Sequence, residues 1–253
     1  MCTLLYFHRV FDGTPVLLLA NRDESLDRAS APPALLADGG DCRPSVYGPR
    51  DLTAGGTWLG VNSAGVVVAL TNHYGTLGKG GGLCSRGHVV MEALAARSAR
   101  GAAETVLGLS PACKHFTILA ADPREAFVVD NPGPEEATLH ELKPGCHAVT
   151  NERFRKEGDE KAGRALKMME AEAARGRPSR EDAARLLGNH EAPGGWTSAL
   201  CVHPDGGIRF GTVSATVTAI GPDGKVKTFL YAPGPPCVTP FKDCTPGFGK
   251  PTS

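Results

Sequence analysis

Residues 2–24, which read CTLLYFHRVFDGTPVLLLANRDE, contain the pattern from which the fold is predicted. Residues 3–10 are apolar and rich in β-branched and aromatic side chains, and residues 15–20 form a second apolar run. Asp12-Gly13, between the two runs, is a turn signal. The stretch therefore predicts a β-hairpin, in which the end of the second strand lies beside the start of the first.

This hairpin would place a polar run beside Cys2. Asn21, Arg22, Asp23 and Glu24 follow the second apolar run and are expected at one rim of the sheet. There, the charge of Arg22 would favour the thiolate of Cys2, and Asp23 would anchor an α-ammonium group. The alternative interpretation of such a run is a solvated, charge-rich turn.

Cys2 is the residue of the sequence that most clearly suggests a chemical reaction. It has a small side chain and follows Met1, so aminopeptidases are expected to remove the methionine. The exposed α-amine would titrate near about 7.7–8.0 and the thiol near about 8.5, so a proton passes easily between them. Cys2 would then be nucleophile and base at once. The alternative is an inert cysteine at the second position.

Outward from the hairpin, the pattern predicts strands, then helices, then strands again. Further strands are expected at residues 57–61, 65–70, 115–121, 126–129, 197–203, 208–220 and 225–231. Helices are expected at residues 86–98, 102–109 and 159–175, and after Ser179, where Asp182 nearly completes a capping box. Residues 28–55 are rich in Pro, Gly and Asp and predict a long surface loop.

These elements describe one layered domain. Strands and helices in this order, with hairpin connections, are typical of an α+β domain with antiparallel sheets, here over residues 1–231. Residues 232–253 are rich in Pro and Gly and predict an extended tail that packs on the surface or is partly disordered. The sequence assigns no oligomeric state.

The composition excludes several classes of protein. The 27 basic residues balance the 27 acidic ones, which argues against a general nucleic-acid binder. No apolar run approaches the roughly 18 residues of a membrane helix. The amino terminus lacks the basic start and the long apolar stretch of a secretory signal. The expected location is therefore the cytosol, with the eight cysteines present as thiols.

The spacing of cysteines and histidines predicts no metal site. No two cysteines form a Cys-x-x-Cys pair, so the usual structural zinc and dithiol redox spacings are absent. His73, Cys84 and His88 can be imagined as a metal-binding set, but nothing in their spacing requires one.

Short motifs in register along the chain resemble the NRDE family, also called the transport-and-Golgi-organisation-protein-2 family. The motifs are the start Met-Cys-Thr, Asn21-Arg22-Asp23-Glu24, Gly55-Gly56-Thr57-Trp58-Leu59-Gly60, Leu70-Thr71-Asn72, Arg86-Gly87 and Thr150-Asn151. The resemblance implies a four-layer αββα sandwich of the N-terminal nucleophile hydrolase type. It also implies kinship with the choloylglycine hydrolases and penicillin V acylases, which use an N-terminal Cys on linear amides.

The resemblance also implies roles for individual residues. Cys2 matches the nucleophile, and Arg22 and Asp23 resemble the Arg and Asp that flank it in the acylases, where two residues separate them. Asn72 and Asn151 are similar in position to oxyanion-hole donors, which are worth roughly 3–4 kcal/mol each in an organised acyl-transfer site. The remaining motif residues are assigned to ligand binding: Asn21, Glu24, Trp58, Thr71 and Arg86.

Two further features bear on catalysis. Thr212, Ser214 and Thr216 alternate along a predicted strand, which places all three on one face. The family often has an Arg where this chain has Val213, and the acylase relatives use a late Arg in the site, so this departure puts full catalytic competence in question. Residues 78–82, GKGGG, lack the P-loop spacing and predict a flexible lid after Asn72.

These features lead to two main hypotheses. The first is an N-terminal-cysteine hydrolase that acts on a small linear amide or acyl compound through a thioester and needs no cofactor. The second is a non-catalytic carrier of haem or of a lipid- or acyl-CoA-like ligand, since the family is associated with haem mobilisation and lipid homeostasis. Haem would take an axial ligand from Cys2, His8 or His73. A third, an interaction protein in trafficking, has no positive support in the sequence.

Overall fold

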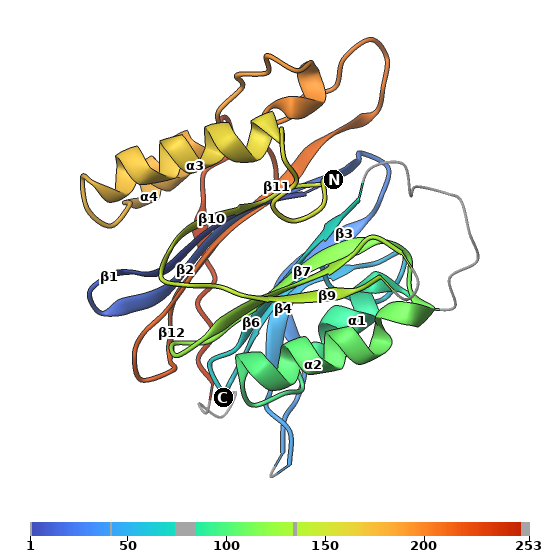
Figure 1. Cartoon of the computed structure of the whole chain (residues 1–253), viewed down its shortest axis with the longest axis vertical. Coiled ribbons are helices and arrows are strands. Elements are labelled where there is room, and N and C mark those ends of the chain that lie inside the picture. Colours follow the sequence, from blue (N-terminus) through green and yellow to red (C-terminus); the bar gives the residue numbers. More distant parts are fainter. Residues whose placement is uncertain (1, 41, 74–83, 134–135, 249–253) are drawn as a thin grey trace.

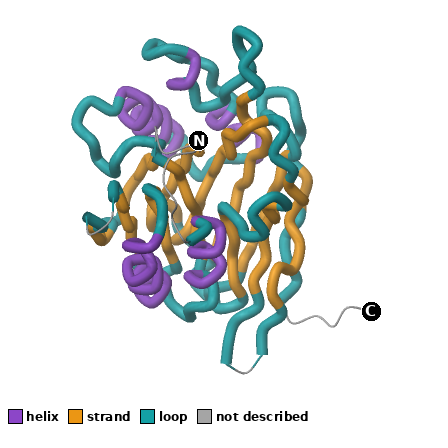
Figure 2. The backbone as a smooth tube through the Cα atoms, turned by 90° about the vertical axis from the view of Figure 1, so that its right-hand side faces the viewer, coloured by secondary structure: helices purple, strands orange, loops and turns teal. Residues whose placement is uncertain are grey.

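The computed structural model describes residues 2–40, 42–73, 84–133 and 136–248, which form two antiparallel sheets between two layers of helices (Figures 1 and 2). One sheet has the strand order β10 (Gly145–Val149), β1 (Cys2–Phe11), β2 (Thr14–Ser25), β11 (Phe210–Ile220), β12 (Val226–Ala232) and β13 (Lys242–Asp243). The other has the order β3 (Ser30–Ala37), β4 (Val46–Asp51), β5 (Leu59–Asn62), β6 (Val67–Asn72), β7 (Phe116–Ala121), β8 (Ala126–Asn131) and β9 (Thr138–Glu141).

The helices cover the outer faces of the two sheets. Helices α1 (Arg86–Ala93) and α2 (Ala99–Leu109) pack on the second sheet, and α3 (Glu160–Ala173) and α4 (Arg180–Leu187) pack on the first (Figure 1). Two short 3-10 turns span Ser110–Ala112 and Trp196–Ser198. The predicted αββα sandwich is therefore confirmed.

The hairpin of β1 and β2 is buried on both faces. Leu4, Leu18 and their alternate neighbours pack between the two sheets, whereas Leu5 and Leu19 pack under α3 and α4. Because successive strand residues point to opposite faces, a strand between two apolar layers needs apolar residues at every position. This explains the unbroken apolar runs of the sequence.

The polar run after the hairpin lies inside the sheet. Strand β2 continues to Ser25, with Cys2 opposite Arg22 on one side and Thr212 opposite Asp23 on the other. The predicted proximity of this run to Cys2 is confirmed. The predicted end of the strand at residue 20 is wrong, because β1 and β11 supply backbone partners for the residues that follow.

A β-bulge at Val213 overturns the predicted single face of hydroxyls. The register of β11 against β2 shifts between Thr212 and Ser214, so these two residues lie opposite the adjacent residues Asp23 and Arg22. Adjacent residues of a strand face opposite ways. The extra residue of the bulge therefore sends Thr212 toward the helices, and Ser214 toward the other sheet.

One predicted loop and one predicted strand are also wrong. The predicted loop at residues 28–55 contains β3 and β4. Pro32 and Pro33 are tolerated in β3 because it is an edge strand. The predicted strand at residues 197–203 forms no ladder in the described structure. Its backbone bonds instead go to Asn189 and Thr212, through Cys201 N–H to Asn189 O (2.9 Å) and Thr212 N–H to Val202 O (2.7 Å).

The helix predicted at residues 86–98 ends at Ala93 because Asn62 binds the carbonyls that follow. Its buried amide donates to the carbonyl oxygens of Leu94 and Ala96, each at 2.7 Å, and its Oδ1 accepts from Ala64 N and Val66 N, each at 3.0 Å. The next helix begins at Ala99, with Ser98 as its N-cap. The predicted capping box of Ser179 and Asp182 is confirmed on α4.

Asn62→Ala should destabilise the fold by about 3 kcal/mol or more. The substitution leaves two carbonyl groups and two backbone N–H groups, one of them the buried N–H of Val66, without their partner. Each loss of a buried partner costs about 1–3 kcal/mol. Chemical denaturation of both proteins measures the difference. Glu104→Ala, at an exposed position of α2, should stay within about 0.5 kcal/mol. Equal effects of the two substitutions would contradict the structural role of Asn62.

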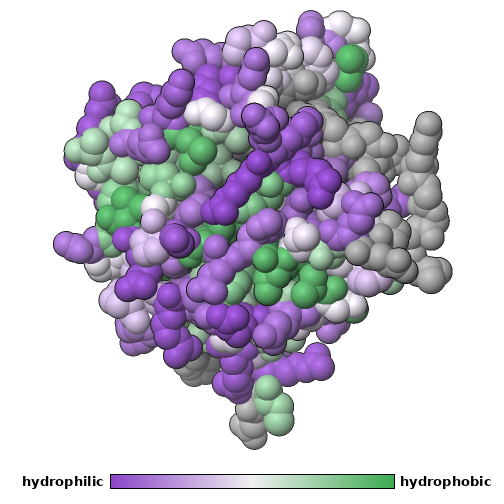
Figure 3. Space-filling view, viewed as in Figure 1, coloured by the Kyte–Doolittle hydropathy of each residue, from purple (hydrophilic) through white to green (hydrophobic). Residues whose placement is uncertain are grey.

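The carboxyl-terminal residues return along the first sheet. Strand β13 pairs with β12, Phe241 is buried, and Cys244 N–H donates to Phe229 O at 2.8 Å. On the face seen in Figure 3, hydrophilic side chains predominate and the hydrophobic ones form small separate groups. Among the described helices, none combines the length and apolarity needed to cross a membrane.

Candidate active site

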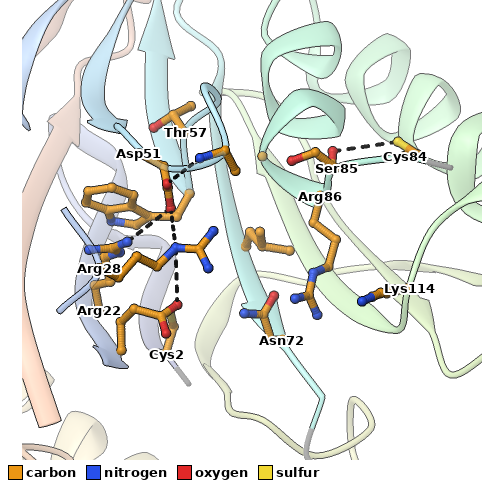
Figure 4. A pocket seen from close by; sticks show the side chains of 15 residues that line it. Cys2, Arg22, Arg28, Asp51, Thr57, Asn72, Cys84, Ser85, Arg86 and Lys114 are labelled. Carbon is orange, nitrogen blue, oxygen red and sulfur yellow. Dashed lines mark hydrogen bonds and ion pairs between the residues drawn. The ribbon is translucent and has the colours of Figure 1, made fainter. Parts of the chain in front are cut away.

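A pocket of ≈ 380 Å³ opens where the start of β1 and the end of β2 meet the second sheet and the start of α1 (Figure 4). Its volume lies within the range of about 300–1,000 Å³ that is typical of small-molecule sites. The lining residues come from both sheets: Cys2, Arg22, Glu24, Arg28, Asp51, Ala54, Thr57, Trp58, Leu70, Asn72, Cys84, Ser85, Arg86, Gly87 and Lys114.

Cys2 lies at one edge of this pocket and is 6% exposed. It is the first residue of β1 in the described structure, and the alternation of the strand turns its side chain toward the second sheet, as for Leu4. Burial raises the pKa of the Cys2 thiol, and the nearby charge of Arg22 lowers it by less. The predicted influence of Arg22 thus has the expected sign, but the group is a thiol at neutral pH and needs a base to become a nucleophile.

The Arg22 guanidinium is fixed by two neighbours. It stacks on Trp58 with 4.1 Å from Cζ to the ring centroid, and its Nη2 lies 3.1 Å from Asp51 Oδ2. Arg28 Nε donates to the same oxygen at 2.8 Å. Burial would raise the pKa of Asp51, but the hydrogen bond from Arg28 leads the effects that lower it. This carboxylate is therefore ionised, and it orients both arginines along one wall.

The opposite wall carries Arg86 and Lys114 (Figure 4). Arg86 Nη1 donates to His115 O at 3.2 Å, and burial lowers the pKa of Arg86. The lining contains four basic side chains, Arg22, Arg28, Arg86 and Lys114, against two acidic ones, Glu24 and Asp51. A partly desolvated cationic wall of this kind favours a ligand that carries negative charge.

The two predicted oxyanion residues have different positions. Asn72 ends β6 and lines the pocket. Asn151 is not among the lining residues, and its Nδ2 donates to the main-chain oxygen of Asn72 at 2.7 Å. Asn151 thereby holds the end of β6, whereas Asn72 lines the same pocket as Cys2.

Besides Asn151, three predicted site residues lie outside the pocket lining: Asn21, Asp23 and Thr71. Asn21 donates from Nδ2 to Leu187 O and Leu200 O, each at 2.8 Å, and Thr71 Oγ1 donates to Thr117 O at 3.5 Å. Asp23, like Asn21, faces the helices because the alternation of β2 separates both from Arg22.

Asp23 belongs to a buried polar group beside the start of β1. Its Oδ1 accepts from Thr212 Oγ1 at 2.6 Å, and its Oδ2 lies 4.0 Å from Lys161 Nζ. Burial raises the pKa of Asp23 and lowers that of Lys161. This position behind Cys2 is compatible with holding a cation at the amino terminus, and that role remains a prediction.

The remaining residues predicted for the site, the lid and the metal have different positions. Glu24, Trp58 and Arg86 line the pocket with Cys2. The predicted lid at residues 78–82 lies outside the described residues. His73, considered for a metal or for haem, binds Thr117 Oγ1 at 2.8 Å and Asp130 Oδ1 at 3.1 Å.

Sequence reasoning missed several residues of the pocket. Arg28 and Asp51 lie within the stretch predicted as a surface loop, and Lys114 follows a 3-10 turn with no motif around it. Only the pairing of β3 with β4 and of β4 with β5 brings Asp51 to the arginines. No local signal in the sequence indicates this meeting.

A family model named Transport and Golgi organisation 2 matches residues 1–229, nearly the whole of the described fold. The chain belongs to the Transport and Golgi organisation 2 family. No curated protein matches it significantly.

Solved structures similar to this family member include an amidase, a hydrolase and an acylase. An N-acylethanolamine-hydrolyzing acid amidase ortholog of Caenorhabditis elegans is 14% identical, with a TM-score of 0.55 over 88% of this chain and 93% of that one. A mutant conjugated bile acid hydrolase of Clostridium perfringens is 11% identical, with a TM-score of 0.58 over 91% and 88%. Penicillin V acylase of Agrobacterium tumefaciens is 15% identical, with a TM-score of 0.52 over 97% and 86%. The likeness of this Transport and Golgi organisation 2 family member to these structures is one of fold.

Proposed function

We propose that the chain is an N-terminal-cysteine hydrolase that cleaves a small linear amide or acyl compound bearing an anionic group. The observation that carries the proposal is the buried Cys2 at the edge of a pocket lined by Asn72 and by four basic side chains. The structural neighbours, an amidase, a bile acid hydrolase and an acylase, support the reaction class, and the cationic lining supports the charge of the substrate.

The mechanism begins with the removal of Met1, which frees the α-amine of Cys2. The amine takes the thiol proton, and Sγ attacks the substrate carbonyl carbon. The oxyanion that forms is stabilised by the side-chain amide of Asn72. As the carbonyl re-forms, the C–N bond breaks and the leaving amine takes the proton from the α-ammonium group, which leaves a thioester on Cys2.

Water completes the cycle. The α-amine accepts a proton from water as the hydroxide attacks the thioester carbonyl, and the thiol leaves with that proton. Arg86 and Lys114 lie on the wall across from Arg22 and would hold the anionic end of the substrate (Figure 4). Arg22, fixed by Asp51 and Trp58, keeps a positive charge near Sγ throughout.

The first test is the intact mass of the purified, natively expressed protein. We expect a mass lower by one methionine residue, because a free α-amine on Cys2 is required for the base. Brief incubation with an activated anionic acyl ester should then add one acyl group, which peptide mapping should locate on Cys2. Retention of Met1 on the whole population would reject the proposed base.

Carriage without turnover is the second candidate, and the same basic lining favours it. Four cations suit the carboxylates of haem or the acidic end of a lipid-like ligand as well as they suit a substrate. Of the three residues predicted as haem ligands, Cys2 alone lines this pocket; His8 Nδ1 lies 2.9 Å from Tyr6 OH. Haem carriage therefore predicts a Soret shift on titration that Cys2→Ala removes, with no acyl transfer to the protein.

A further inference from the structure

Two cysteines and two histidines that the proposed function does not use meet on the surface beside β11. They come from three segments: His190 follows α4, Cys201 and His203 precede β11, and Cys237 follows β12. Their ligand atoms all lie within 4.8 Å of one another. We propose that His190, Cys201, His203 and Cys237 form a structural zinc site.

The distances fit tetrahedral coordination. Cys201 Sγ lies 3.7 Å from Cys237 Sγ, and His203 Nε2 lies 3.3 Å from Cys237 Sγ and 4.0 Å from Cys201 Sγ. Bonds of about 2.3 Å to sulfur and about 2.0–2.1 Å to nitrogen place two sulfurs about 3.8 Å apart, and sulfur and nitrogen about 3.6 Å apart. Two thiolates and two imidazoles are a usual closed ligand set for structural zinc.

Contacts around the four residues orient them for metal binding. His190 Nδ1 donates to Cys201 O at 3.1 Å, which leaves Nε2 as the atom that binds metal. The rings of His190 and His203 lie 4.9 Å apart between centroids. A Cβ on Gly188 would come within 3.3 Å of both Cα and Cβ of Cys237, so glycine permits this close approach. Cys201 is buried and the other three are exposed, which gives the ion a way in.

The site would tie three segments to the first sheet. The end of α4, the segment at residues 199–203 and the segment after β12 share no β-ladder with one another in the described structure. Val202 N–H donates to Thr212 Oγ1 at 2.8 Å, and Thr212 Oγ1 donates to Asp23 at 2.6 Å. Zinc at this site would therefore hold in place the segment at residues 199–203, which covers Asp23. The inference stands independently of the proposed hydrolysis.

The test measures zinc bound to the full-length protein. After incubation with zinc chloride and gel filtration, we expect one zinc per chain, and cobalt chloride should give the intense visible bands of tetrahedral cobalt with thiolate ligands. Cys237→Ser should weaken zinc binding by about 100-fold or more, because an exposed ligand is lost while the buried Cys201 stays in place. Zinc at about 100 times its dissociation constant should raise Tm by about 5–10 °C.

Matched variants separate this site from other thiols and imidazoles. Cys42→Ser and His88→Gln, both at exposed positions outside the cluster, should retain one zinc per chain, whereas His203→Gln should not. Zinc binding at trace level in the natural sequence would overturn the proposal. So would equal loss in Cys42→Ser, or a Cys201–Cys237 disulfide as the main form in protein prepared without reductant and with zinc present.

Discussion

Turnover of an anionic acyl substrate should fall by about 10³-fold or more when Cys2 is replaced by alanine. The variant loses the sulfur that is proposed to form the thioester, and loss of a nucleophile in acyl transfer leaves only the contribution of binding and of the oxyanion site. The measurement is kcat/KM on an activated ester and on the corresponding amide. Cys2→Ala should also fail to take up the acyl group in the mass experiment.

The matched control for this prediction is Cys146→Ala. Cys146 lies opposite Phe7 on the neighbouring strand β10 and does not line the pocket. It should retain turnover within about 3-fold, as expected for a small change away from the reacting atoms. Unchanged turnover in Cys2→Ala would reject Cys2 as the nucleophile, provided that the thermal unfolding of the variant matches that of the natural sequence.

Arg86→Ala should raise KM for an anionic substrate by about 10–100-fold and leave KM for a neutral analogue nearly unchanged. A hydrogen bond to a charged group contributes about 1.5–3 kcal/mol, and each 1.4 kcal/mol corresponds to about a tenfold change in affinity. Burial lowers the pKa of Arg86 because it disfavours the charged guanidinium in the free protein. An anion that enters the pocket would stabilise this charge. The measurement compares two substrates that differ only in a carboxylate.

Two further variants make this test specific. Arg86→Lys keeps the charge and should recover part of the affinity, while losing the planar contact of the guanidinium. Arg50→Ala removes an exposed arginine that is not part of the lining and should change neither KM. Equal increases of KM for both substrates in Arg86→Ala would show that the residue acts through His115 and the loop shape, and would contradict the proposed anion contact.

Much of the fold follows from local pattern. The turn at Asp12-Gly13 and the two apolar runs predict the hairpin and bring the polar run beside Cys2. A bulge between His8 and Phe11 then shifts the register by one residue, so that Arg22 and not Asp23 lies opposite Cys2. The motif residues Cys2, Glu24, Trp58, Asn72 and Arg86 all line the pocket. Their positions could be predicted because each lies at or next to the end of a strand or helix that the pattern identifies.

The rest depends on contacts between segments that are distant in sequence. The bulge at Val213 turns Thr212 to the helix side, which no period of two in the sequence indicates. Asn62 ends α1 from more than thirty residues away, so helix periodicity alone overestimates the length of that helix. Asp51 reaches Arg22 only because β4 pairs within the second sheet.

The sequence by itself determined the layered architecture, the hairpin and the position of residues 21–24 beside Cys2, because these depend on apolar periodicity and on a short turn. Tertiary structure alone decided which polar residues face the pocket and that His190, Cys201, His203 and Cys237 meet. The physical reason is that both outcomes depend on strand register and on the docking of segments across layers. A shift of one residue in register turns a side chain to the opposite face of the sheet. Amino-acid composition does not indicate which register forms.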